Sequence, residues 1–64
     1  MNKQYHVVVW ADGKEDEQKE YDVFADSYDM AIECVKESPD YRNRFRDAIT
    51  NQEPMFVTCR EVEK

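Results

Sequence analysis

The chain has 64 residues and a formal net charge of −6, because 15 Asp and Glu residues oppose 9 Lys and Arg residues. A chain this short forms one domain that buries only about 60% of the surface exposed by its unfolded form, which leaves little room for a deep catalytic pocket. Hydrophobic residues still make up 41% of the sequence, so we expect a folded, soluble domain and not a disordered acidic tail.

A first strand is predicted over residues 4–10, where the sequence Gln-Tyr-His-Val-Val-Val-Trp is rich in β-branched and aromatic side chains. Alternation divides these side chains between the two faces, with Tyr5, Val7 and Val9 on one and His6, Val8 and Trp10 on the other. Because both faces are fairly apolar, we expect this strand to be central in its sheet.

A second strand is predicted over residues 19–25, and its connection to the first strand can take two forms. A tight turn at the dipeptide Asp12-Gly13 would pair the charged residues 14–18 with valines. A longer loop would instead set Tyr21 and Val23 against the first strand. Burial favours the longer loop, because register follows the hydrophobic pattern.

A helix is predicted to follow directly, with Asp26 or Ser27 as its N-cap and Asp29 adding negative charge in its first turn. Its apolar stripe falls at positions i, i+3, i+4 and i+7 and consists of Tyr28, Ala31, Ile32 and Val35. The solvent-exposed side carries Asp29, Glu33, Lys36 and Glu37.

A short second helix is predicted over residues 39–50, since Pro39 suits the first helical position and Ser38 suits the N-cap. Its apolar positions are Tyr41, Phe45, Ala48 and Ile49. A last strand is predicted over residues 55–62.

This order predicts an α+β fold, in which residues 1–64 form a single acidic β-β-α-(α)-β domain. The simplest assembly is a three-stranded antiparallel sheet in the order 2-1-3, with the first helix packed on one face. The other face is then solvated, covered by the short second helix, or covered by a partner. The sequence leaves these three alternatives open.

The sequence contains no arrangement of side chains typical of an active site. Cys34, Cys59 and the single histidine, His6, lack the spacing of a zinc site or of a disulfide framework. Gly13 is the only glycine, so a glycine-rich phosphate loop is excluded. We expect no enzyme activity, no metal and no cofactor. We also expect no signal peptide, no membrane span, and a cytoplasmic protein whose two thiols are reduced and at least partly buried.

The net charge is concentrated in residues 12–29, which hold eight acids and two bases, while the rest of the chain is neutral. A solvated face that keeps a small protein soluble explains such a run. A docking surface for a basic patch on another macromolecule is the less common alternative. The acids are Asp12, Glu15, Asp16, Glu17, Glu20, Asp22, Asp26 and Asp29.

Three arginines, Arg42, Arg44 and Arg46, alternate with Tyr41 and Phe45 in a pattern similar to a local nucleic-acid contact. These arginines do not share one helical face, however, and the net charge repels a polyanion. We expect them to pair with nearby acids or to lie over the apolar stripe, and otherwise to make secondary contacts with a protein partner.

Residues 23–33 have the sequence Val-Phe-Ala-Asp-Ser-Tyr-Asp-Met-Ala-Ile-Glu. This stretch resembles the small podophage inhibitors of bacterial RNA polymerase, which have a similar length and β-β-α-β order. Their last strand is of Phe-Val-Thr-Arg type, here Phe56-Val57-Thr58-Cys59-Arg60. The resemblance implies that acidic residues and one arginine contact the β′ jaw of the polymerase. The matching positions are Glu20, Asp26, Asp29, Glu33 and Arg60.

These observations favour a non-catalytic, phage-encoded inhibitor or modulator that docks an acidic face on a host enzyme in the bacterial cytoplasm. Bacterial RNA polymerase is the target implied by the resemblance. We expect a monomer or weak dimer that contacts neither nucleic acid nor a membrane. The alternatives are an acidic nucleic-acid mimic that blocks a nuclease or CRISPR effector, and an accessory module that forms oligomers.

Overall fold

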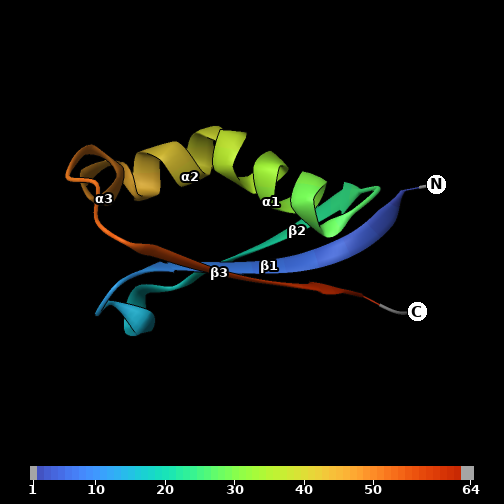
Figure 1. Cartoon of the computed structure of the whole chain (residues 1–64), viewed down its shortest axis with the longest axis horizontal. Helices are drawn as coiled ribbons and strands as arrows, with labels where there is room; N and C mark the ends of the chain where they lie inside the picture. The colour runs from blue at the N-terminus through green and yellow to red at the C-terminus, as the bar shows by residue number, and fades with distance from the viewer. Residues whose placement is uncertain (1, 63–64) are drawn as a thin grey trace.

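The fold consists of one antiparallel sheet and a layer of helices, described for residues 2–62 in a computed structural model (Figure 1). The elements in chain order are β1 (Lys3–Ala11), the 3-10 helix η1 (Glu15–Glu17), β2 (Lys19–Ala25), α1 (Tyr28–Glu37), α2 (Pro39–Arg44), α3 (Arg46–Thr50) and β3 (Met55–Glu61). The three strands lie in the order β2-β1-β3. The predicted α+β fold, strand order and central first strand are therefore confirmed.

The hairpin between β1 and β2 uses the longer loop. Val7 lies opposite Tyr21 and Tyr5 lies opposite Val23, so the apolar residues of both strands share one face. The loop contains η1, and Gly13 takes a positive φ of 78° that other residues rarely adopt. The hydrophobic pattern selected this register, because a slip by one residue would turn these side chains into solvent.

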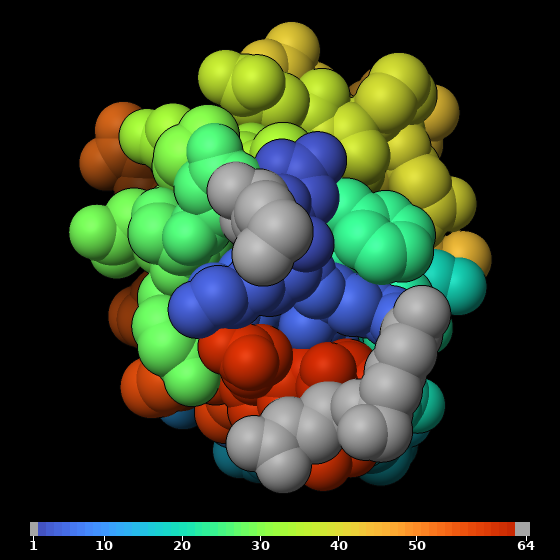
Figure 2. Space-filling model, turned by 90° about the vertical axis from the view of Figure 1, so that its right-hand side faces the viewer, coloured from blue at the N-terminus to red at the C-terminus, as the bar shows by residue number. Residues whose placement is uncertain are grey.

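The core lies between the sheet and the helices, which cover a single face (Figure 1). It consists of Tyr5, Val7, Val9, Ala25, Ala31, Val35, Tyr41 and Phe45. Figure 2 views the molecule from the right of Figure 1, with the residues of α1 and α2 in green and yellow above the strands. The stripe that α1 buries is narrower than predicted, because Ala31 and Val35 are buried whereas Tyr28 is 51% exposed. One side of the Tyr28 ring packs on the Tyr5 ring, with the two centroids 5.0 Å apart, and the other side of the Tyr28 ring faces solvent.

The second helix is broken in two, which corrects the prediction of one helix over residues 39–50. The break is at Phe45, whose φ of −108° and ψ of 24° are not helical. Ser38 separates α1 from α2, since its hydroxyl donates to the Val35 carbonyl at 2.9 Å and accepts from the Tyr41 N–H at 3.2 Å. The bend buries Tyr41, Phe45 and Ala48 together on the face that α1 covers. The second helix therefore does not cover the other face of the sheet.

Candidate functional site

The face of the sheet opposite the helices carries the side chains that alternate with the core residues. We call it the open face, and define it by Gln4, His6, Val8 and Trp10 of β1, Glu20, Asp22 and Phe24 of β2, and Phe56, Thr58 and Arg60 of β3. None of these residues is buried. The three helices that follow η1 lie on the other side of the sheet (Figure 1).

One end of the open face is aromatic. Trp10 and Phe56 are cross-strand neighbours whose rings stack, with centroids 5.9 Å apart and planes inclined by 21°. Phe56 remains 43% exposed. Val8 lies next to Trp10 on the same face of the central strand. Phe24 is 64% exposed, but it lies opposite Gln4, at the other end of the open face and beyond His6. Large apolar side chains gathered on an uncovered face are typical of a surface that binds another macromolecule.

A cluster of charged groups occupies the middle of the open face. The Nδ1 of His6 lies 2.9 Å from Asp22 Oδ1, and its Nε2 lies 2.8 Å from Glu20 Oε1. Both ring nitrogens can donate to these carboxylates only when the imidazole is protonated. The hydrogen bonds to Asp22 and then to Glu20 raise the pKa of His6, against the opposing effect of burial. The cluster therefore favours the imidazolium form.

His6 on the central strand has Asp22 as its neighbour on β2 and Arg60 as its neighbour on β3. Within residues 2–62, no carboxylate pairs with the Arg60 guanidinium. The open face thus presents exposed carboxylates along one edge strand and, along the other, a guanidinium that no carboxylate of the described residues 2–62 pairs with. Such a guanidinium can form two parallel hydrogen bonds with a carboxylate on a binding partner.

The residues that the resemblance selected fall into two groups. Glu20 and Arg60 lie on the open face, at opposite sides of His6. Asp29 and Glu33 lie on the exposed side of α1, which covers the other face of the sheet. Asp26 lies in the short connection between β2 and α1. One flat partner surface cannot reach both groups at once.

Sequence reasoning missed the His6 cluster and the Trp10–Phe56 stack as features of one site. The available signal was the alternation within each strand, which placed Trp10 with His6 and Phe56 with Arg60. The register that joins the two strands was needed to bring these pairs together. This register follows from long-range pairing and not from either strand alone.

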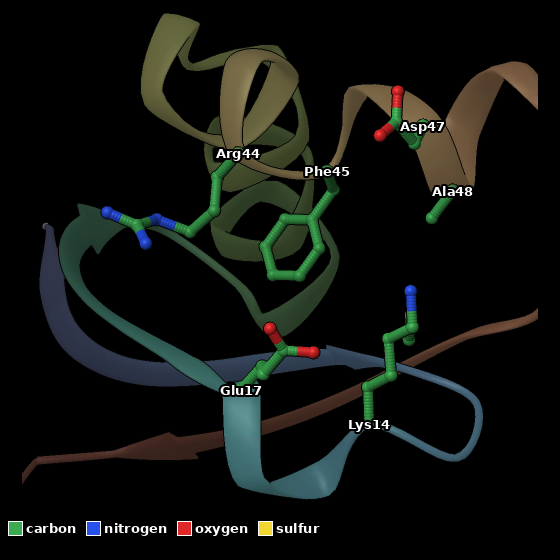
Figure 3. Close-up of a pocket in the computed structure, with 7 residues that line it drawn as sticks. Lys14, Glu17, Arg44, Phe45, Asp47 and Ala48 are labelled. Atoms are coloured by element: carbon green, nitrogen blue, oxygen red, sulfur yellow. The ribbon is translucent and has the colours of Figure 1, made fainter.

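The three arginines do not form one cluster, because Arg44 lies apart from Arg42 and Arg46. Arg44 pairs with Asp40, with Nε 3.7 Å from Oδ2, and lines a pocket of about 300 Å³ between the hairpin loop and the short helices. Figure 3 shows the Phe45 ring pointing into this space from above and Lys14 and Glu17 rising from below. The pocket mixes Lys14 and Arg44 with Glu17 and Asp47, so it has no preference for ligands of one charge. Arg42 and Arg46 lie elsewhere, in a groove on the helical layer.

The two thiols have different surroundings, and neither forms a disulfide. Cys59 is half-buried, and burial raises its pKa. Cys34 is exposed, which contradicts the expectation that both would be partly buried, because the buried stripe of α1 is narrow and excludes it. Across residues 2–62, no three His, Cys, Asp or Glu side chains are arranged to hold a metal ion. No helix in this part of the chain is both long and apolar enough to cross a membrane.

The comparisons with known proteins add no assignment to this geometry. No protein-family model, curated protein or solved structure matches the chain.

Proposed function

We propose that this domain is a non-catalytic binding module that docks its open face on a basic surface of a partner protein and thereby inhibits or modulates that partner. The observation that carries the proposal is the composition of the open face. It combines the Trp10–Phe56 stack, in which Phe56 is exposed and Trp10 is half-buried, with carboxylates on β2, and α1, α2 and α3 lie on the other side of the sheet. Charge complementarity selects the partner, because the chain has a net charge of −6.

The aromatic end and the charged middle have different roles in this interface. Trp10 and Phe56 supply apolar area that becomes buried on binding, and such aromatic anchors commonly dominate the binding energy. The net charge of −6 on the whole chain attracts a basic partner and increases the rate of association. Arg60 fixes the orientation by pairing with a carboxylate at the edge of the partner's basic surface.

The target that we propose is bacterial RNA polymerase, and the protein would be phage-encoded and act in the bacterial cytoplasm. The support is the resemblance of residues 23–33 and of the last strand to the podophage inhibitors. Glu20 and Arg60 would make direct contacts from the open face. Asp26, Asp29 and Glu33 would then act through long-range attraction, because Asp29 and Glu33 lie on α1 and not on the open face.

The test is promoter-dependent RNA synthesis by purified bacterial RNA polymerase with increasing amounts of this protein. We expect inhibition that weakens as salt rises, since screening reduces charge pairing. The variants Arg60→Glu and Phe56→Ala should lose inhibition while their circular dichroism spectra and melting temperatures stay close to those of the parent. Glu20→Lys should weaken inhibition as well. Glu15→Lys in η1 is its control, because both substitutions reverse one exposed carboxylate.

Three results would count against parts of this proposal. Unchanged inhibition in the open-face variants would place the interface elsewhere. No inhibition at tens of micromolar, with no co-elution with the polymerase, would reject this target. Competition by DNA for the bound partner would favour an acidic mimic of nucleic acid, because such a mimic occupies a nucleic-acid site.

A further inference from the structure

A groove of about 500 Å³ runs over the helical layer, on the side of the molecule away from the open face. Side chains from all three helices line it: Lys36 of α1, Tyr41 and Arg42 of α2, and Arg46, Ile49 and Thr50 of α3. The groove spans the break at Phe45, where α2 ends and α3 begins.

The charges that line the groove are all positive. Lys36, Arg42 and Arg46 contribute cations, and no Asp or Glu is among the lining residues. Within residues 2–62, none of these three cations forms an ion pair, whereas Arg44 is paired with Asp40. A protein with a net charge of −6 therefore keeps one concave surface that attracts anions.

The groove also has an apolar component. Tyr41 is 5% exposed and forms part of its wall, while Ile49 is 43% exposed on α3. Ile49 was expected to lie on the buried stripe of a single helix, and the bend places it at the groove instead. A ligand that binds the three cations buries the Ile49 side chain only if the ligand also has an apolar group that contacts it.

We infer that this groove binds an acidic peptide segment of a partner protein, in which carboxylates flank an apolar side chain. The carboxylates would meet Lys36, Arg42 and Arg46, and the apolar side chain would cover Ile49 beside the Tyr41 ring. A single inorganic anion could pair with the cations but could not cover Ile49. The mode matches recognition of acidic motifs by arginine clusters, with an apolar contact that adds specificity.

This inference is independent of the proposed function, because the groove and the open face lie on opposite sides of the sheet. If both are used, the domain joins a basic surface on one side to an acidic segment on the other. The two sites can be tested separately, since variants of Arg42 or Arg46 leave the open face unchanged.

The experiment measures binding of a fluorescein-labelled twelve-residue peptide of alternating Glu-Glu-Leu and Asp-Glu-Leu units to the intact protein by fluorescence anisotropy. Two control peptides replace either the acids by Gln or the leucines by Ser, and both should bind at least about tenfold more weakly, a change equivalent to 1.4 kcal/mol. The double variant Arg42→Gln with Arg46→Gln, and the single variant Ile49→Ser, should show the same loss. Arg44→Gln is the matched control, because it removes a neighbouring arginine outside the groove.

Circular dichroism of each variant establishes that the fold is retained. No binding of the acidic peptide below millimolar concentration would overturn the inference, as would equal losses in the Arg44→Gln control and the double variant. Displacement of the peptide by millimolar inorganic phosphate would also overturn it, in favour of a simple anion site. Self-association in sedimentation experiments that disappears in the double variant would identify a second copy of this chain as the occupant and would overturn the assignment to another protein.

Discussion

Replacing Val35 by Asp tests whether α1 is held on the sheet by its narrow buried stripe. Val35 is 1% exposed and belongs to the core cluster that includes Tyr5, Val7 and Val9. No buried polar or charged side chain lies in the described part of the core, residues 2–62. A carboxyl group at this position would therefore have no buried charged group to pair with.

The cost has two parts, and together they exceed the stability expected of a domain this small. Loss of a buried valine costs about 1.5 to 3 kcal/mol. Keeping the new carboxyl group protonated at pH 7 costs about 4 kcal/mol, because the pH then lies about three units above the ordinary Asp pKa. A single core of this size rarely supplies more than about 3 to 5 kcal/mol. Val35→Asp should therefore be unfolded at pH 7.

The assay is urea and thermal unfolding followed by circular dichroism at pH 7 and near pH 4. The pKa of a buried carboxyl group is raised on folding, so its destabilising effect grows as pH rises above the unfolded-state pKa and shrinks below it. Relative to the parent at the same pH, the variant should regain much of its stability in acid. Met30→Asp is the control, because Met30 lies on the same helix but is 47% exposed, and it should change stability by less than about 0.5 kcal/mol. If both variants are equally stable at pH 7, Val35 does not anchor α1.

Three further predictions concern polar contacts. Asp22 and Glu20 raise the pKa of His6, so the His6 cluster should contribute its full stability below the ordinary histidine pKa of 6.5 and lose it as pH rises through the raised pKa. Urea unfolding at a series of pH values should show this decrease in the free energy of unfolding, and the decrease should be absent in His6→Gln. Tyr21→Phe removes the hydrogen bond that the Tyr21 hydroxyl donates to Asp40 Oδ2 at 2.8 Å, and should cost about 0.5 to 1.5 kcal/mol. This hydrogen bond is the main cause of the lowered Asp40 pKa. The Asp40 pKa measured by NMR titration should therefore be higher in Tyr21→Phe than in the parent. An unchanged Asp40 pKa would show that the hydrogen bond is not its cause. Ser38→Ala removes contacts at both the end of α1 and the start of α2, so its unfolding free energy should fall further than that of Ser27→Ala, which loses one cap and about 1 kcal/mol.

Local patterns in the sequence determined the strands, the caps and the hairpin register. The alternation around Tyr5, Val7 and Val9 matches the buried face of β1, and Ser27 caps α1 where the sequence placed an N-cap. The hairpin register followed as well, since only the longer loop buries Tyr21 and Val23 together. These features were predictable because side-chain period and capping depend on neighbours that are close in sequence.

The tertiary structure alone decided which face stays open and where the helical layer bends. The apolar spacing of Tyr41, Phe45, Ala48 and Ile49 is compatible with one continuous helix, and nothing local to Phe45 requires a break. With the bend, Tyr41, Phe45 and Ala48 are buried, whereas Ile49 is 43% exposed and lines the groove. The open face likewise needs β2 and β3 on either side of β1. It is made by contacts between distant segments, and such contacts are set by the packing of the whole chain and not by the propensity of any one segment.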